Sequence, residues 1–204
     1  MTNKPVHTVR NASALQKQRG VGIIEILVAV VIFSLGMLSL AAMQLASKRA
    51  TYEATQRSIA TGLARDILER MRGNPDQLDA YVSTNLGDPN APLAAPDSNC
   101  VNTDCSPAQL ATFDLVDWES LVLGATEKLD AENAGGLVSA RACITNTDGT
   151  VTIAIAWLGV SSADNPTESA CGNDVTGLYD DPDETAGNNL KRRLLVMSTF
   201  IGAS

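Results

Sequence analysis

Residues 17–46 read KQRGVGIIEILVAVVIFSLGMLSLAAMQLA, in which a short basic stretch precedes a long apolar one. From Ile26 to Ala46 the chain has 21 residues without a charged side chain. As an α-helix this run is about 31 Å long, which matches the hydrocarbon core of a bilayer. The basic residues Lys17 and Arg19 favour a cytoplasmic N-terminus. The run therefore predicts a single membrane-spanning helix, with the rest of the chain on the far side of the membrane.

One carboxylate, Glu25, lies inside this apolar segment. A charged side chain at the centre of a membrane helix costs roughly 2.5–3.5 kcal/mol, and less near the helix end, so it needs a partner. A cut after Gly20 would create a free α-amino group on Val21, one helical turn before Glu25. That positive charge and the N-terminal end of the helix dipole would both stabilise the carboxylate.

The run K-Q-R-G-V-G-I-I-E resembles the class III leader of type IV pilins and pseudopilins. The resemblance implies cleavage between Gly20 and Val21 by a membrane-embedded prepilin peptidase, followed by N-methylation of Val21. It also implies that Glu25 helps to dock a new subunit into a growing filament. The family usually has Phe at the first mature position, where this chain has Val21. The alternative is a plain signal anchor; an ordinary secretory signal fits less well because the apolar run is too long and no A-x-A site follows it.

The charge distribution excludes several classes of function. The chain has 15 basic and 23 acidic residues, a net charge of −8. The first twenty residues hold four of the basic residues and none of the acidic ones, so their removal would lower the net charge to −12. The only histidine, His7, would be removed with them, which leaves no imidazole for acid–base catalysis or metal binding. We expect no enzymatic activity, no cofactor, no bound metal, no small-molecule substrate and no nucleic-acid partner.

A helical pattern continues beyond the membrane segment. Ile59, Leu63, Ile67 and Met71 recur every four residues, and no proline occurs between Val21 and Pro75. Opposite charges four residues apart predict the ion pairs Arg65–Glu69 and Asp66–Arg70. Gly73-Asn74-Pro75 predicts the end of the helix. We therefore expect three parts: a leader over 1–20, a long helix over 21–73 whose residues 21–46 cross the membrane, and a periplasmic globular domain over 74–204.

The globular part combines one helix with a few strands. The stretch 74–106 is rich in Pro, Asn, Asp, Gly and Ser and is expected to be a loop. Ser106-Pro107 is typical of a helix start, and a helix is expected over 107–128. Strands are expected over 137–145, 150–158 and 194–201, the first two joined by the turn 146–149. The fold class expected is α+β, a long N-terminal helix packed on a small antiparallel sheet.

A second resemblance covers this region. Residues 52–75, YEATQRSIATGLARDILERMRGNP, and residues 105–118, CSPAQLATFDLVDW, are similar to the PilV family of minor pilins. The resemblance implies a minor subunit that acts with other minor pilins and the major pilin to prime pilus assembly at the inner membrane. It implies incorporation into the fibre at the cell surface, with roles in twitching motility and adhesion. The alternatives are a pilus-tip binding module or adhesin, and a pseudopilin of a type II secretion system.

The four cysteines, Cys100, Cys105, Cys143 and Cys171, all lie in the exported part of the chain. An even number of cysteines in an oxidising compartment predicts disulfides, with three possible connectivities. We favour Cys100–Cys105, which flanks a short loop, together with Cys143–Cys171, which links a strand to a loop. The rival is a zinc site formed by all four cysteines, although their spacing lacks the usual C-x-x-C pattern.

Two charged stretches complete the sequence features. Residues 161–189 contain no basic residue and several acidic ones. A solvated acidic loop is the favoured interpretation, and the alternative is a calcium site formed by Asp180, Asp181, Asp183 and Glu184. The triplet Lys191-Arg192-Arg193 follows. It is either the charged start of a strand or a contact site for nucleic acid or acidic neighbours.

Overall fold

The computed structural model describes residues 20, 22–125, 127–130, 132–133, 135–175 and 177–202. Its elements in chain order are α1 (Ile23–Arg72), the 3-10 helix η1 (Pro75–Tyr81), β1 (Ser83–Leu86), α2 (Pro107–Val122), β2 (Lys128–Leu129), β3 (Glu132–Asn133), β4 (Arg141–Thr147), β5 (Thr150–Leu158) and β6 (Arg192–Phe200). The chain divides into two compact units, Met1–Leu45 and Ala46–Ser204, so the boundary lies within α1.

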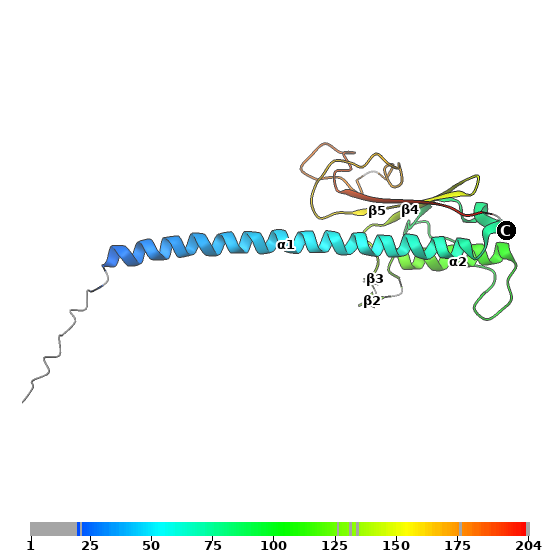
Figure 1. Cartoon of the computed structure of the whole chain (residues 1–204), viewed down its shortest axis with the longest axis horizontal. Helices are drawn as coiled ribbons and strands as arrows, with labels where there is room; N and C mark the ends of the chain where they lie inside the picture. The colour runs from blue at the N-terminus through cyan, green and yellow to red at the C-terminus, as the bar shows by residue number, and fades with distance from the viewer. Residues whose placement is uncertain are drawn as a thin grey trace, which may run out of the picture. The chain divides into compact units, whose positions relative to one another are not determined.

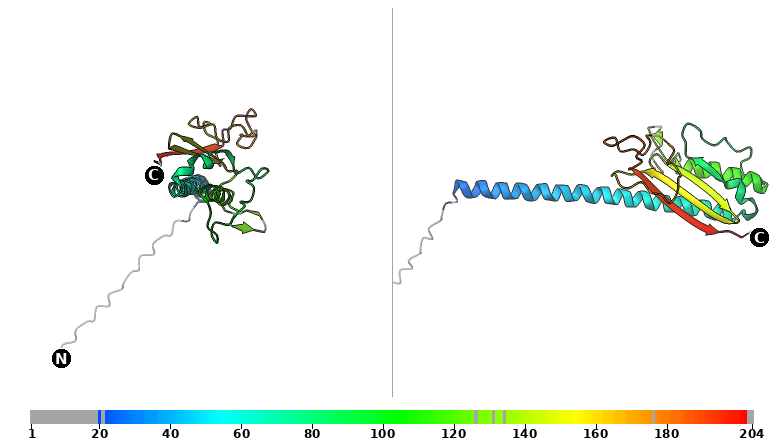
Figure 2. Two further views of the ribbon diagram at one scale, coloured as in Figure 1. Left: turned by 90° about the vertical axis from the view of Figure 1, so that its right-hand side faces the viewer. Right: turned by 90° about the horizontal axis from the view of Figure 1, so that it is seen from above.

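The second unit is built on a four-stranded antiparallel sheet with the strand order β1-β4-β5-β6. The C-terminal part of α1 and α2 lie side by side against one face of this sheet (Figures 1 and 2). The loop between β5 and β6 covers part of the opposite face (Figure 2). The strands β2 and β3 form a separate short pair. The chain therefore has the expected α+β fold, a long N-terminal helix packed on an antiparallel sheet.

The part of α1 within the second unit packs on the sheet through one apolar face. Ala60, Ala64, Ile67 and Met71 are fully buried. Of the apolar residues expected from the sequence, Ile67 and Met71 are therefore in this face, whereas Ile59 and Leu63 are only partly buried. The small side chains of Ala60 and Ala64 allow a close approach to the neighbouring elements. The indole N–H of Trp118 on α2 donates to the carbonyl oxygen of Leu63 at 2.9 Å. This contact fixes α2 against α1.

The charged side chains near the C-terminal end of α1 connect it to α2. Arg70 contacts Asp66 at 3.0 Å, as expected, and also Asp117 at 2.7 Å and Asp114 at 3.4 Å on α2. The prediction of an ion pair between Arg65 and Glu69 was wrong, because Glu69 pairs with Arg72 instead. Arg65 makes no ion pair with any described residue and remains exposed.

The stretch expected to be a loop over 74–106 contains η1 and β1, so that part of the prediction was wrong. Three apolar side chains, Leu78, Tyr81 and Leu86, point into the core from these two elements. The hydroxyl group of Tyr81 donates to Asp114 at 2.6 Å, and Asn74 donates to the carbonyl oxygen of Pro107 at 2.7 Å. Tertiary packing therefore orders a segment whose polar composition suggested none.

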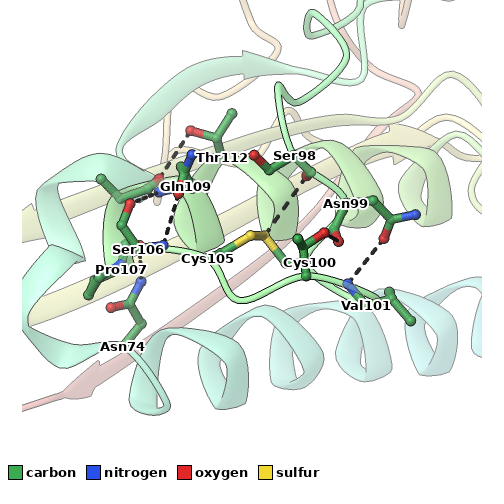
Figure 3. Close-up of a disulfide and its surroundings, with 12 residues drawn as sticks. Asn74, Ser98, Asn99, Cys100, Val101, Cys105, Ser106, Pro107, Gln109 and Thr112 are labelled. Carbon is green, nitrogen blue, oxygen red and sulfur yellow. Dashed lines mark hydrogen bonds between the residues drawn. A yellow bond between two sulfur atoms is a disulfide. The ribbon is translucent and has the colours of Figure 1, made fainter.

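α2 begins at the residue predicted from the sequence, but it ends earlier than predicted. Ser106 caps the helix: its hydroxyl accepts from the N–H of Gln109 at 3.3 Å, and the Gln109 side chain accepts from the N–H of Ser106 at 2.9 Å (Figure 3). The helix stops at Val122 and does not reach Lys128. The reason is Gly124, whose φ of +64° turns the chain beside Gly135, where a side chain would collide with backbone.

The strands follow the expected hairpin with shifted ends. β5 begins and ends as expected, and the turn consists of Asp148 and Gly149, with φ of +52° and +82°. β4 starts at Arg141, not at residue 137, because positive φ values at Gly136 and Ser139 keep the preceding segment out of the sheet. β6 covers 192–200 in place of 194–201.

The four cysteines form the two disulfides favoured by the sequence. Cys100 and Cys105 close a short loop before α2 (Figure 3), and Cys143 joins β4 to Cys171 in the loop that follows β5. These bonds leave no described cysteine free for zinc. The second bond lies on the face of the sheet opposite the helices, where Gly172 packs against Ala156. Its role is to hold the loop on the sheet.

The two disulfides should differ in their contribution to stability. The Cys143–Cys171 bond links residues 28 apart and the Cys100–Cys105 bond residues 5 apart. The chain-entropy model gives about 3.6 kcal/mol for the longer loop and about 2 kcal/mol for the shorter one. Replacing both members of each pair by Ala in the detergent-solubilised chain should therefore lower the melting temperature more for the longer loop. Fluorescence of the buried Trp118 and Trp157 reports unfolding; equal losses, or the reverse order, would contradict this assignment.

Candidate functional site

The N-terminal segment contains the residues expected to be processed. Glu25 lies in the first turn of α1, where its N–H donates to the carbonyl oxygen of Gly22 at 3.0 Å. A β-carbon added to Gly20 would meet nothing within 4 Å. Val21 and residues 1–19 lie outside the described residues. The described part of the segment therefore leaves Gly20 open and places Glu25 at the positive end of the helix dipole.

The first part of α1 exposes an apolar surface. The large apolar side chains from Ile23 to Leu45 are between 53% and 83% exposed. The helix contains a stretch that is long and apolar enough to cross a membrane by length and composition. Exposed apolar surface of this extent marks a membrane span or a protein interface.

The two serines in this segment satisfy their hydroxyl groups within the helix. Ser34 donates to the carbonyl oxygen of Val30 at 2.7 Å, and Ser39 donates to that of Leu35 at 3.0 Å. An unpaired hydroxyl would be costly in hydrocarbon, so these bonds make the segment compatible with a membrane. Glu25 is the one ionisable side chain between Gly22 and Leu45.

The loop between β5 and β6 is organised by a buried cation, Arg192. This side chain at the start of β6 is 1% exposed. Its guanidinium donates to Asn165 Oδ1 at 2.8 Å, to the carbonyl oxygens of Ser169 and Cys171 at 3.0 and 2.7 Å, and to the carbonyl oxygen of Pro166. Burial lowers the pKa of Arg192, although arginine stays protonated in proteins. Four acceptors from one loop therefore converge on one fork of donors.

The other members of the basic triplet also have partners within the chain. Lys191 lies 3.7 Å from Asp181 in the acidic loop. Arg193 lies 3.3 Å from Glu53 on α1 and also donates to the carbonyl oxygen of Ser161. Glu53 additionally accepts from the N–H of Val160 at 2.8 Å. Arg192 therefore begins β6, and Lys191 and Arg193 beside it contact acidic side chains of the same chain.

Two of the four carboxylates of the alternative calcium site, Asp180 and Asp181, accept hydrogen bonds from within the loop. Asp180 accepts from the N–H groups of Gly187 and Asn189, and these bonds hold its pKa below the ordinary value. Asp181 accepts from the hydroxyl of Ser162 and the N–H of Asp183, which lower its pKa in the same way. The described part of the chain contains no group of three or more His, Cys, Asp or Glu side chains arranged to hold a metal ion.

Sequence reasoning missed the role of Arg192. The three adjacent basic residues suggested the charged start of a strand, and nothing in the local pattern distinguishes the middle residue from its neighbours. The available signal was the lack of any basic residue over 161–189, a loop of 29 residues that nevertheless carries a cysteine. A loop this long that is fixed to a sheet needs internal hydrogen-bond partners, and the next cation in the chain was the candidate.

Replacing Arg192 should destabilise the second unit. Arg192→Met keeps the length of the side chain but leaves four acceptors without a donor, so the free energy of unfolding should fall by about 2–4 kcal/mol. Arg192→Lys should lose nearly as much, because an ammonium group cannot satisfy the same fork of acceptors. Lys191→Met is the matched control, expected to cost under about 1 kcal/mol. Denaturant unfolding followed by tryptophan fluorescence measures these changes; equal stability of the Met variants would refute the anchoring role.

Comparison with known families agrees with this geometry. A model for the prokaryotic N-terminal methylation motif matches residues 15–41, and a model described as type IV pilin Tt1218 matches residues 42–116. No curated protein and no solved structure matches the chain. The two adjoining matches cover the apolar segment, the rest of α1 and most of α2. The chain therefore carries a prokaryotic N-terminal methylation motif, and over residues 42–116 it is similar to the type IV pilin that the second model describes.

Proposed function

We propose that the chain is a minor pilin of the PilV type that takes part in priming and assembling type IV pili at the inner membrane. The observation that carries the proposal is the position of Glu25. It is an acidic residue in the first turn of a helix whose apolar side chains are exposed along the whole segment from Ile23 to Leu45. A membrane helix that keeps a costly carboxylate needs a cationic partner, which the N-terminal amine left by removal of the leader can supply.

Processing would create the required charge. Prepilin peptidase would cut between Gly20 and Val21 and methylate the new N-terminus, a secondary amine that is protonated at neutral pH. The cationic amine of Val21 would then lie one turn from Glu25. In this proposal the pair neutralises the carboxylate while the helix leaves the bilayer and packs among other pilin helices. Glu25 thereby sets the depth at which a subunit joins the filament.

The proposed partners follow from the same surface. An exposed apolar helix of this length packs against similar helices, so other minor pilins and the major pilin are the proposed neighbours. The subunit would reside in the inner membrane as a single-pass protein with a periplasmic ectodomain. It would then enter the fibre at the cell surface. The three proposed parts are the leader 1–20, the helix 21–73 with its membrane segment 21–46, and the ectodomain 74–204.

Two alternatives differ in where the chain acts. A pilus-tip binding module would use the ectodomain loops, and the ordered loop around Arg192 supports that possibility because it presents Asp183 and Glu184 to solvent on a fixed backbone. A pseudopilin would share the leader but serve secretion. In a strain that lacks this chain, loss of adhesion with a normal number of pili would identify the tip-binding module. Loss of secretion with normal pili would identify the pseudopilin.

Removing the charge of Glu25 tests the assembly role. Glu25→Gln and Glu25→Ala should reduce the number of surface pili at least tenfold, because the amine at Val21 loses its partner. Glu25→Asp, which keeps the charge, should retain more pili than Glu25→Gln. Ser39→Ala is the control for a change within the same helix. Electron microscopy counts the pili, and immunoblots of the inner membrane check that each variant is present at the normal level.

Normal pilus numbers in the Glu25→Gln strain, with the variant present in the membrane, would exclude the assembly role. A reduced amount of variant protein would instead indicate failed insertion or increased degradation, and the comparison would then rest on pili counted per molecule of membrane protein.

A further inference from the structure

One edge of the sheet is open. β6 pairs with β5 over nine residues in an unbroken register, from Leu158 opposite Arg192 to Thr150 opposite Phe200. Among the described residues no strand lies on its other side, where the sheet ends. The segment from Leu194 to Phe200 contains no proline and no charged side chain.

The orientation of the backbone follows from one hydrogen bond. The N–H of Ile201 donates to the carbonyl oxygen of Gly149 at 2.8 Å, so it points toward β5. In an antiparallel ladder, successive residues direct their backbone groups to opposite sides. The N–H and C=O groups of residues 193, 195, 197 and 199 therefore face β5. Those of Leu194, Val196, Ser198 and Phe200 point away from the sheet.

These outward groups have no partner in the described part of the chain. Natural sheets usually protect a long edge with charged residues, proline or a bulge. β6 has none of these over Leu194 to Phe200. The side chains of Val196 and Phe200 are 36% and 69% exposed, which adds apolar surface next to the free backbone groups. The edge therefore offers what an incoming strand needs.

Arginine side chains border the outer edge of β6 on the neighbouring surface of α1. A hollow of about 280 Å³ lies between β6 and α1 and is bordered by Arg65 and Arg72, and a second of about 380 Å³ is bordered by Arg57 and Arg193. Arg72 and Arg193 have carboxylate partners. Arg57 and Arg65 are exposed and make no ion pair with any residue that the structure describes.

Acidic side chains border the same hollows and offset only part of this positive charge. Glu69 is already paired with Arg72, which leaves Glu168 as the one unpaired carboxylate among the lining residues. Two unpaired arginines beside an open strand edge are notable in a chain whose net charge is −8.

We propose that the outer edge of β6 binds an extended acidic segment of another protein chain by strand addition. The backbone of the segment would pair with Leu194, Val196, Ser198 and Phe200, and its carboxylates would approach the arginines of α1. A second copy of β6 fits poorly, because two such edges would bring the same arginines together. This inference goes beyond the assembly role and does not depend on it.

A designed peptide tests the proposal on the full chain in detergent. The probe is a nine-residue peptide with blocked ends that alternates Glu with Val and Thr. At nine-tenths occupancy it should slow hydrogen exchange about tenfold at the outward amides of Val196, Ser198 and Phe200. A peptide with Lys in place of Glu should bind at least tenfold more weakly. A third peptide keeps every Glu but is N-methylated at the backbone donors that would face β6, and it should not protect these amides.

Substitutions in the chain complete the test. Val196→Pro removes one outward N–H without breaking a bond to β5, and it should weaken binding at least tenfold. Val196→Thr retains the N–H and is the matched control. Arg57→Gln with Arg65→Gln should weaken binding and reduce its dependence on salt. Exchange at the β5 amide of Ile153 checks that each variant remains folded.

The proposal is overturned if the acidic peptide protects no β6 amide. It is also overturned if the N-methylated peptide binds as well as the unmodified one, since attraction would then be electrostatic alone. Equal binding of the Lys peptide would remove the role of the arginines. If Val196→Pro does not fold, the N-methylated peptide still decides between strand addition and simple charge attraction.

Discussion

The structure depends on one constraint: a single helix, α1, must satisfy two different surroundings. Its backbone groups bond within the helix, so its first part can lie in hydrocarbon without unpaired polar groups. From Ile23 to Leu45 its large apolar side chains are exposed, whereas further along the helix Ala60, Ala64 and Ile67 are buried within the second unit. The first part of the helix is apolar on all sides, and the later part is apolar on one face only. This change can be recognised in the sequence, and it occurs without a break in the helix.

The second unit gains its order from contacts to α1 and from a buried cation. Trp118 bonds to the backbone of α1, and Arg70 joins α1 to two carboxylates of α2. On the other face of the sheet, Arg192 and the Cys143–Cys171 disulfide hold the same loop. A domain with a modest core can therefore support a long loop, because covalent and charge-assisted contacts replace the apolar packing that the loop lacks.

Local patterns predicted the parts of the fold that local physics controls. The helical period predicted Ile67 and Met71 in the buried face of α1. The Ser106 cap predicted the start of α2, and the turn over 146–149 predicted the hairpin. The end of α2 and the start of β4 were predicted at the wrong residues. Both depend on residues at positive φ, Gly124 for α2 and Ser139 for β4. The regular structure within residues 75–86 and the role of Arg192 were not predicted either, because both depend on partners that are distant in the sequence. At the N-terminus, Glu25 could be recognised from the sequence because a charged side chain in a membrane helix costs free energy and is therefore rare.

The proposed assembly role requires that the first twenty residues are removed and that Val21 begins the membrane helix beside Glu25. The most direct measurement is mass spectrometry of the N-terminal peptide of the protein purified from its native membrane. We expect a chain that begins at Val21 and carries one methyl group on the terminal nitrogen. A protein that retains residues 1–20, or one that is cut at another position, would contradict it.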